Sequence, residues 1–502
     1  MADTKREIER KYESDDSGLP DLTGVAGVAA VVDKGVAHLD ATYYDTPDQR
    51  LASASITLRR RTGGSDAGWH LKLPVGPGVR DEVQAPLSET VPRSLTALVR
   101  ARIRDAELRP VVRLRSERDV RDLVDTDGRL LAEVSVDAVR AERLTDDGGT
   151  AQWTELEVEL ADGGDPAFLD KVDKRLRKAG VRPSKSSSKL ARALAETAPK
   201  KKRKKEQRAA PDPVTAGDHV LAYVREQRDA ILELDPAVRQ DTYDSVHRMR
   251  VATRRMRSTF RSFSKVLDRA VTDPIGEELK WLAGELGVDR DQEVLTERLT
   301  AALDELPRTL VVGPVRTRLR TWAHARRGGS RRRLIAVLDG KRYLQLLETL
   351  DALVVEPPLL EAAAGKPEKV VAKAVRKDFG KVAELVEQAL GESAGHERDL
   401  ALHDARKKAK RTRYAAEAAV PALGSPASAL VKSAKALQNL LGDHQDSVMT
   451  RETLREIAAQ AHGAGESAFT YGVLYGREEQ RAAADEAELP GLWAEIKGGV
   501  QV

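Results

Sequence analysis

The sequence contains no cysteine, and only 4% of its residues are aromatic. The absence of cysteine excludes thiol catalysis, disulfides and thiolate metal sites, and it fits a reducing compartment. No segment approaches the uncharged run of about 20 residues that a membrane helix needs. The first residues lead directly into charged sequence without an apolar signal core. The sequence therefore predicts a cytoplasmic protein with no membrane partner.

Charged residues are abundant and nearly balanced in sign. The 502 residues include 84 basic and 80 acidic ones, which gives a formal net charge of +4. Such a small sum hides local clusters of one sign, so the individual segments are more informative than the total. The length is too great for one hydrophobic core and predicts two or three domains.

The character of the sequence changes abruptly at a short basic stretch. Residues 1–197 are typical of strands separated by Gly, Pro and Asp, with one helix expected near 165–180. Residues 198–214 carry the basic run Lys200 to Lys205 and several prolines, which is typical of a flexible, solvated linker. Residues 215–495 are rich in Ala, Leu, Arg, Lys and Glu with helical periodicity. We expect an α+β multidomain protein in which an antiparallel β domain precedes an all-α domain.

Charged side chains recur with period two along the expected strands, while apolar residues occupy the alternate positions. Alternate residues of a strand point to opposite faces, so one face packs and the other is ionised. For a single strand a solvent-facing surface would explain this, but several strands of mixed sign favour a wet barrel interior that holds a polyanion and a divalent cation. The sets are Glu7, Glu9 and Lys11; Arg59 and Arg61; His70 and Lys72; Arg80 and Glu82; Arg113 and Arg115; Glu133, Ser135 and Asp137; and Glu155, Glu157 and Glu159.

Five segments of this domain together resemble the CYTH family, whose members are also called triphosphate tunnel metalloenzymes. They are residues 7–11 (EIERK), 42–48, 58–61, 70–74 and 155–159. The resemblance implies an eight-stranded antiparallel barrel whose tunnel binds a triphosphate. It also implies a divalent metal, Mg²⁺ or Mn²⁺, for hydrolysis or, in some members, for cyclisation of ATP.

The resemblance also implies roles for individual residues. Phosphate contacts fall to Lys11, Arg59, Arg61, Lys72, Arg113 and Arg115, and metal ligation to Glu7, Glu9, Asp137, Glu157 and Glu159. Glu155 supplements or replaces one of its acidic neighbours, and Lys185 and Lys189 compete for one further phosphate contact. Glu82 is either a ligand or a water-orienting base, so the candidate catalytic residues are Glu7, Glu9, Lys11 and Glu82.

The second domain contains an internal repeat. One helical face carries His247, Arg250, Arg254 and Arg257, and the same spacing recurs in His403, Arg406, Lys410 and Arg413. A Leu-Gly pair followed by Asp comes about 40 residues after each histidine, at Leu286 and at Leu441. We therefore expect two related helical halves, at about 215–355 and 365–495.

Both repeated helices are densely basic, and Arg255, Arg261 and Lys407 add to them. A solvated helix normally intersperses acidic residues, so this density favours an anionic partner over a plain basic surface. The two segments resemble the CHAD domain, which implies paired helical bundles around a basic channel that binds inorganic polyphosphate. Glu417 stands in the second copy where Arg261 stands in the first, so the two ends of the channel are not expected to be equivalent.

Nucleic acid is the rival partner, because phosphate contacts alone would bind either polymer. Single-stranded nucleic-acid binders usually add aromatic stacking platforms, and aromatic residues are scarce here, so nucleic acid is unlikely. We expect a metal-dependent triphosphatase that binds polyphosphate, including association with cytoplasmic polyphosphate granules. The alternatives are a class IV-type adenylate cyclase and a non-catalytic polyphosphate-binding scaffold.

Overall fold

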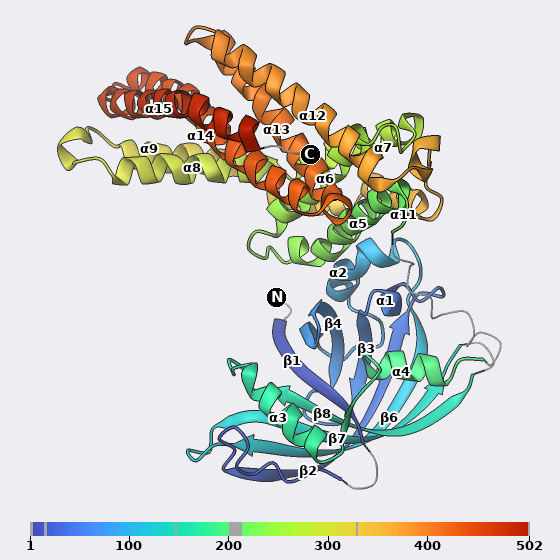
Figure 1. Cartoon of the computed structure of the whole chain (residues 1–502). Helices are drawn as coiled ribbons and strands as arrows, with labels where there is room; N and C mark the ends of the chain where they lie inside the picture. Colours follow the sequence, from blue (N-terminus) through green and yellow to red (C-terminus); the bar gives the residue numbers. More distant parts are fainter. Residues whose placement is uncertain (1–3, 15–17, 146–147, 200–212, 328–329, 500–502) are drawn as a thin grey trace. The chain divides into compact units, whose positions relative to one another are not determined.

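The computed structural model describes residues 4–14, 18–145, 148–199, 213–327 and 330–499. The chain forms two compact units, residues 1–210 and 211–502, and we describe each by itself (Figure 1). Most of the predicted linker at 198–214, including its basic run, lies outside the described residues.

The first unit is a closed antiparallel barrel of eight strands. The strand order β5-β4-β3-β2-β6-β7-β8-β1 is closed by pairing of β1 with β5, in which Glu7 lies opposite Arg80. A two-residue strand, β9 (Arg182–Pro183), adds to the edge of β1. The barrel strands are β1 (Thr4–Glu13), β2 (Ala30–Asp45), β3 (Thr57–Thr62), β4 (Gly68–Gly76), β5 (Val79–Ala85), β6 (Arg109–Val124), β7 (Leu130–Arg143) and β8 (Thr150–Leu160).

Helices cover parts of the outer wall of the barrel. The helix α2 (Arg93–Ile103) packs Leu95 and Val99 on apolar residues of β3, β4 and β5. The helix α3 (Ala167–Lys178) packs Leu169 on apolar residues of β1, β7 and β8. The short helix α1 (Arg50–Ser53) follows a turn in which the buried carboxylate of Asp45 accepts hydrogen bonds from backbone N–H groups. The apolar positions of the strands therefore face outwards here and leave the alternate positions for the interior.

The helix α4 (Lys189–Glu196) packs against the interior of the barrel instead. Leu190 and Leu194 form a core with Leu114, Val139 and Trp153 from three strands. The helix begins where the Ser188 side chain accepts a hydrogen bond from the backbone N–H of Ala191. One end of the barrel interior is therefore apolar and filled.

The second unit is helical, and the alanine-rich, periodic sequence accounts for this. Its first helix starts with a reciprocal capping box between Thr215 and Asp218. The α-helices are α5 (Ala216–Arg239), α6 (Ser245–Ser262), α7 (Arg269–Glu285), α8 (Val288–Asp304), α9 (Val315–Arg327), α10 (Ser330–Asp339), α11 (Lys341–Val355), α12 (Pro367–Gly391), α13 (His396–Leu423), α14 (Ser425–Gly463) and α15 (Phe469–Gly499). Short 3₁₀ turns occur at η1 (Arg308–Leu310) and η2 (Glu361–Ala364).

Two of the apolar cores of this unit join α8, α9 and α12–α15. Val386, Leu402, Leu441 and Trp493 belong to the core shared by α12, α13, α14 and α15. A second core joins the α8–α9 hairpin to α14 and α15 (Figure 1). Within the part of the chain that the structure describes, none of the helices is both long and apolar enough to span a membrane.

Candidate functional site

The barrel encloses a cavity of about 620 Å³ lined by charged side chains. Lys11 and Glu9 reach it from β1, Arg59 from β3, Lys72 from β4 and Glu157 from β8. Because these side chains occupy the same alternating position on their strands, the barrel directs all of them inwards. A polar interior of mixed sign is therefore a property of the closed barrel.

Basic side chains crowd one region of the cavity. Arg59 donates to the hydroxyl of Tyr43 at 3.4 Å, and Lys72 forms an ion pair with Glu7. Burial and the neighbouring guanidinium groups of Arg59 and Arg118 lower the pKa of Arg61 to about 9. Cations that repel one another in this way favour an anionic ligand, which would relieve the repulsion.

Glu82 lies among these cations. Its Oε1 is 2.8 Å from Nδ1 of His70 and 3.9 Å from both Lys72 and Arg59, and Gln84 donates to its Oε2 at 3.0 Å. Burial opposes ionisation, but the hydrogen bond from His70 and the charge of Lys72 prevail and hold the pKa of Glu82 below its ordinary value. Glu82 is thus an ionised side chain that positions its basic neighbours.

A second group of carboxylates is buried and fully compensated by cations. Nζ of Lys189 lies 3.0 Å from Asp137, 2.6 Å from Glu155 and 2.7 Å from Glu157. Arg118 donates to both oxygens of Asp137 at 2.8 Å and to Glu157 at 3.0 Å. Although burial alone would favour the neutral acids, these cations hold the pKa values of Asp137 and Glu157 below the ordinary range.

A third group of carboxylates has less positive charge around it. Burial and the nearby carboxylate of Glu82 raise the pKa of Glu7 to about 7, even though Lys72 opposes the shift. Burial and Glu159 likewise raise the pKa of Glu133. Glu7, Glu133 and Glu159 all line the cavity; Glu7 pairs with Lys72, and Glu159 pairs with the exposed Lys5 at 2.8 Å.

Most of the predicted tunnel residues do lie together. The cavity lining includes Glu7, Glu9, Lys11, Arg59, Arg61, Lys72, Glu82, Glu157, Glu159 and Lys189. Asp137 and Glu155 are buried and contact the ammonium of Lys189, and the three carboxylates Asp137, Glu155 and Glu157 place ligand atoms within 4.8 Å of one another. Hard oxygen donors at this spacing could hold a metal ion.

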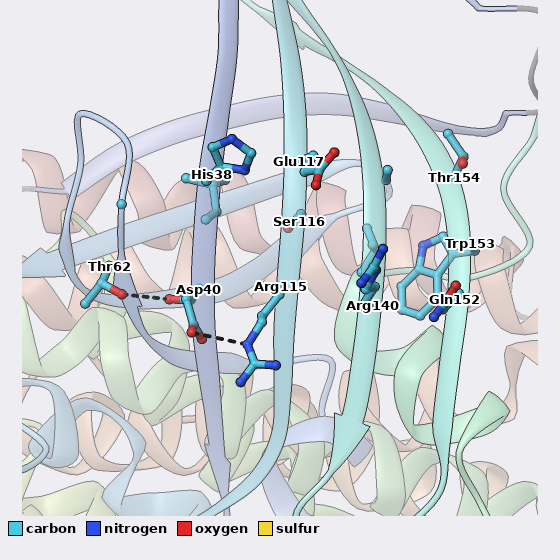
Figure 2. Close-up of a pocket in the computed structure, with 14 residues that line it drawn as sticks. His38, Asp40, Thr62, Arg115, Ser116, Glu117, Arg140, Gln152, Trp153 and Thr154 are labelled. Carbon is cyan, nitrogen blue, oxygen red and sulfur yellow. Dashed lines mark hydrogen bonds and ion pairs between the residues drawn. The ribbon is translucent and has the colours of Figure 1, made fainter.

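Arg113 and Arg115 lie outside this cavity, contrary to their expected inward placement, and of the competing pair Lys185 and Lys189 it is Lys189 that lines the cavity. The Nη2 of Arg113 lies 2.5 Å from Asp40, and Arg115 lines a hollow on the exposed face of β2, β6, β7 and β8, where its guanidinium points towards Asp40 (Figure 2). Lys185 is exposed, whereas Lys189, four residues later, is 8% exposed and reaches the tunnel.

The reason for the correction is the apolar plug at one end of the barrel. Leu114 faces inwards to pack on α4, so Arg113 and Arg115 face outwards. Further along β6 the inward position becomes ionic at Arg118, which the sequence interpretation missed. Arg80 and Tyr43 also line the cavity although neither was proposed as a site residue.

In the helical unit, cations of α6 and α13 face one another. Burial and the charges of Arg406, Arg254 and Arg250 lower the pKa of Lys410 to about 8. Arg406 also lies 3.9 Å from Asp446, the acidic residue of the second Leu-Gly-Asp segment. The structure thus brings the two copies of the basic motif together, and we call the cations of α6 and α13 the basic cluster. Because few acidic residues lie among them, this cluster is suited to bind a polyanion.

One end of the basic cluster carries its own carboxylate. Glu417 lies 2.9 Å from Arg255 and 3.7 Å from Arg413, and it accepts a hydrogen bond from Tyr223. The residue at the same place in the first copy, Arg261, is exposed and lies 3.8 Å from Glu277. The two ends of the repeat therefore differ in charge.

The remaining predicted residues of this unit differ in exposure. Lys407 is exposed and forms an ion pair with Asp404 at 3.0 Å, and His247 is also exposed. Burial and the neighbouring Arg261 lower the pKa of Arg257. Burial and Lys407 lower the pKa of His403, which favours its neutral form.

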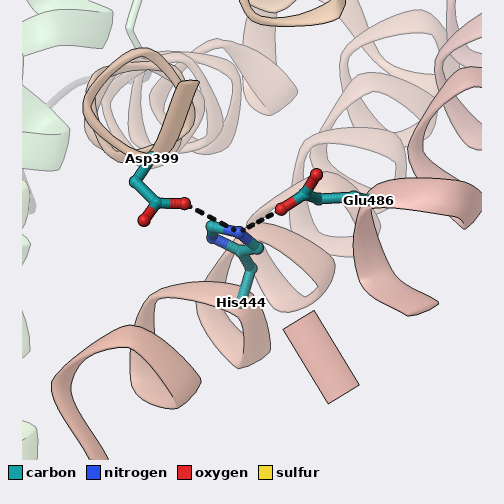
Figure 3. A group of neighbouring side chains, drawn as sticks. All are labelled: Asp399, His444 and Glu486. Carbon is teal, nitrogen blue, oxygen red and sulfur yellow. Dashed lines mark hydrogen bonds and ion pairs between the residues drawn. The ribbon is translucent and has the colours of Figure 1, made fainter. Parts of the chain in front are cut away.

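A separate group joins three helices of this unit. Nε2 of the buried His444 lies 3.4 Å from Asp399 and 3.1 Å from Glu486 (Figure 3). Arg451 and Arg398 lie 3.8 and 3.3 Å from these two carboxylates. Because each acid already has a cationic neighbour, we regard the group as an ion-pair cluster that ties α13, α14 and α15 together.

The protein thus has two domains. The first is a closed barrel with an ionised tunnel, and the second is helical and carries two basic helices. Residues 5–194 match the family model of the CYTH domain, and residues 222–455 match that of the CHAD domain. The chain belongs to these families, with CYTH followed by CHAD.

Relatives of the whole chain and of its helical unit are known. Uncharacterised proteins from two strains of Mycobacterium tuberculosis are 41% identical over 500 residues, which covers 96% of this chain and 94% of theirs. PptA from Streptomyces chartreusis aligns over 56% of this chain and 100% of its own, with 21% identity and a TM-score of 0.48. The CHAD domain from the plant Ricinus communis aligns over 58% of this chain and 95% of its own, with 23% identity and a TM-score of 0.43.

Proposed function

We propose that the protein hydrolyses inorganic triphosphate, or a related triphosphate, in the CYTH tunnel and binds inorganic polyphosphate through its CHAD domain. The observation that carries the first part is the cavity itself, in which crowded cations face separate groups of carboxylates. Arginine and lysine neutralise phosphate oxygens, and carboxylates recruit hard cations that bridge to phosphate. Crowded cations beside carboxylates support a ligand that is both highly anionic and metal-bound.

The carboxylates that fit a divalent cation best are those with too little positive charge around them. Glu7, Glu133 and Glu159 come nearest to this description. Burial raises the pKa of Glu7 to about 7 although Lys72 pairs with it, burial and Glu159 raise the pKa of Glu133, and Glu159 pairs with the exposed Lys5. The three carboxylates Asp137, Glu155 and Glu157 are already paired with three cations, Lys189, Arg118 and Lys11. Bound Mg²⁺ or Mn²⁺ would supply charge neutralisation at the phosphoryl oxygens.

The residues of the chain then act by binding and orientation. Arg59, Arg61 and Lys72 would bind phosphate oxygens on one side, with Glu82 keeping Arg59 and Lys72 in place. Lys11 and Arg118 would neutralise the other side, where they also hold Glu157. Phosphoryl transfer needs little covalent chemistry from the protein, so fixed charges of this kind can supply much of the catalysis.

The filled end of the barrel limits the length of phosphate chain that the tunnel can hold. Because α4 packs Leu190 and Leu194 into the interior, a linear phosphate would enter from the opposite end and stop near Lys189. Such a site favours a short triphosphate or the end of a chain over an internal linkage. Polyphosphate bound by the basic cluster of the CHAD domain is the second part of the proposal, supported by the low pKa of Lys410 among its cationic neighbours.

Phosphate release from inorganic triphosphate, thiamine triphosphate, ATP and long-chain polyphosphate, each with and without Mg²⁺ or Mn²⁺, tests the activity. We expect metal-dependent release from a triphosphate, with a loss of about 10²-fold or more in Arg59→Ala, a size typical of removing one charge-stabilising donor. Arg113→Ala removes an arginine from the outer face of the same barrel and should change little. Cyclic AMP formed from ATP would instead identify a cyclase, and tight binding without turnover would identify a scaffold.

A further inference from the structure

The second helix of the α8–α9 hairpin, α9, belongs to a strongly basic part of the chain. Residues 306–338 include nine arginines and one histidine but no aspartate or glutamate. One side of the hairpin is buried in the core with α14 and α15, where Leu319 and Trp322 pack beside Tyr471. A cavity of about 230 Å³ is lined by residues of both helices, including Leu303, Leu319 and Ala323 of this core.

The residues of α8 and α9 that line this cavity follow one another at steps of one helical turn, and we call this arrangement a ladder and each step a rung. On α9, Arg316, Arg320 and His324 recur every four residues and therefore share one helical face. On the antiparallel α8, Thr300 and Thr296 line the same cavity, and Asp304 lies one turn beyond Thr300. Successive rungs are about 6 Å apart along each helix axis, because each residue rises 1.5 Å.

Only the first rung of the ladder contains an acid. Arg316 forms an ion pair with Asp304, but Thr300 and Thr296 stand where the next two carboxylates would be needed. Among the residues that the structure describes, no ion pair or hydrogen bond is found for the side chains of Arg320 and His324. The hydroxyl of Thr300 is turned to the backbone oxygen of Thr296 at 2.7 Å. The described lining of the cavity thus holds two arginines and a histidine but neither aspartate nor glutamate.

We propose that this cavity is a second binding site for inorganic polyphosphate, separate from the basic cluster of α6 and α13. The proposal rests on the polyphosphate binding proposed above and names a further site for it. A linear anion of repeating charge matches cations that repeat along a helix. Leu303, Leu319 and Ala323 form the floor, and within the described lining no aromatic ring is available for a nucleic-acid base to stack on.

The test measures the affinity of the full-length protein for long-chain polyphosphate and for inorganic triphosphate over a range of salt concentrations. The double variant Arg320→Ala/His324→Ala should bind the long chain about 3- to 10-fold more weakly. Its salt dependence should become shallower by roughly one phosphate contact. Binding of inorganic triphosphate should stay unchanged. Arg332→Ala removes an exposed arginine of α10 outside the cavity and serves as the matched control.

A second variant tests the ladder without removing a cation. Thr300→Asp supplies the missing carboxylate, so it should pair with Arg320 as Asp304 pairs with Arg316 and weaken long-chain binding to a similar extent. The inference is overturned if both variants match Arg332→Ala while the wild-type protein binds polyphosphate. It is also overturned if the variants lose RNA binding alone. A wild-type protein that binds no polyphosphate would refute the proposed CHAD function itself.

Discussion

The guanidinium of Arg250 lies directly against the backbone of Gly287, so closely that a Cβ on this glycine would fall 2.6 Å from Nη2. The second half of the helical unit repeats the contact, with Arg406 lying against Gly442 and a corresponding distance of 3.2 Å. The Leu-Gly pairs that recur in the sequence thus have a physical reason: each glycine leaves room for an arginine of the basic motif. The two halves therefore share this arginine–glycine contact as well as the basic helix.

Gly287→Ala should therefore displace Arg250 and weaken polyphosphate binding. We expect a larger effect than for Gly442→Ala, because the Cβ contact at Gly287 is shorter by several tenths of an ångström. Equilibrium titration with long-chain polyphosphate, alongside circular dichroism to verify folding, measures the difference. Gly284→Ala is the matched control, since a Cβ there meets nothing within 4 Å. Equal binding by all three variants would contradict the proposed role of the arginines.

Lys189→Met should destabilise the barrel. The change leaves Asp137, Glu155 and Glu157 without the ammonium that lies within 3.0 Å of each of them. Removing one partner of a buried ion pair typically costs about 3–5 kcal/mol. Urea unfolding at neutral pH measures the loss, and added Mn²⁺ should restore part of it if the three carboxylates can take up a cation. As a control, Lys185→Met replaces an exposed lysine and should leave the unfolding curve unchanged. If Lys189→Met also left it unchanged, other groups would have to compensate the charge of the three carboxylates.

The sequence could predict the barrel because its alternation of charged and apolar residues persists through many strands. The face of each strand was harder to predict, because the barrel interior is ionic in the tunnel but apolar beside α4. On β6 we predicted Arg113 and Arg115 to face inwards because they are charged, although the interior beside them is apolar. Counting back along the β6–β7 hairpin from its turn at 125–129 would have placed Arg118 opposite Val136. An irregularity between Leu123 and Val124 shifts the register by one residue and brings Arg118 opposite Asp137.

The different pKa shifts of the tunnel carboxylates could not be predicted from the sequence. Glu7 and Glu9 are two residues apart on one strand and both point inwards, yet their pKa values move in opposite directions. Burial raises both pKa values, and the difference arises from the neighbouring charges: Lys11 of the same strand and Lys189 of α4 lower the pKa of Glu9, whereas Glu82 of β5 and Glu159 of β8 raise that of Glu7. The partners from other elements are fixed only when the barrel closes.

Polyphosphate affinity should depend on the protonation of Lys410. Burial and neighbouring arginines lower its pKa to about 8, whereas a bound polyanion would favour the ammonium form. We expect affinity to be highest below pH 8 and to fall as the pH rises from about 8 towards 10, with proton uptake on binding in that window. Calorimetry in buffers of different ionisation enthalpy measures the uptake. Lys410→Arg should abolish it, and uptake that persists in this variant would point to a different group.

Glu417→Gln should strengthen polyphosphate binding. The carboxylate now lies 2.9 Å from Arg255 and 3.7 Å from Arg413, so it competes with any anion for these two cations. Its removal should increase affinity several-fold and steepen the salt dependence, because more phosphate contacts become available. Salt titrations of the variant and the wild type test this. Weaker binding would mean that Glu417 positions the arginines rather than competing for them.

Glu7→Gln should make the metal-free protein more stable at pH 8 than the wild type. The pKa of Glu7 is raised to about 7 from an ordinary 4.5, so the folded protein retains a proton that the unfolded chain has released between these values. The stabilising contribution of this group is therefore complete below about pH 4.5 and is lost as the pH rises through 7. We expect the variant to gain about 1–3 kcal/mol at pH 8 and almost nothing near pH 4.5.

The same variant tests where the divalent cation binds. A cation at Glu7 would neutralise the charge that destabilises the wild type above pH 7, so Mg²⁺ should raise wild-type stability at pH 8. Glu7→Gln lacks this carboxylate and should gain less. Urea unfolding with EDTA and with Mg²⁺ gives all four values. Equal stabilisation of both proteins by Mg²⁺ would place the cation elsewhere, and the compensated carboxylates beside Lys189 would then be the alternative to examine.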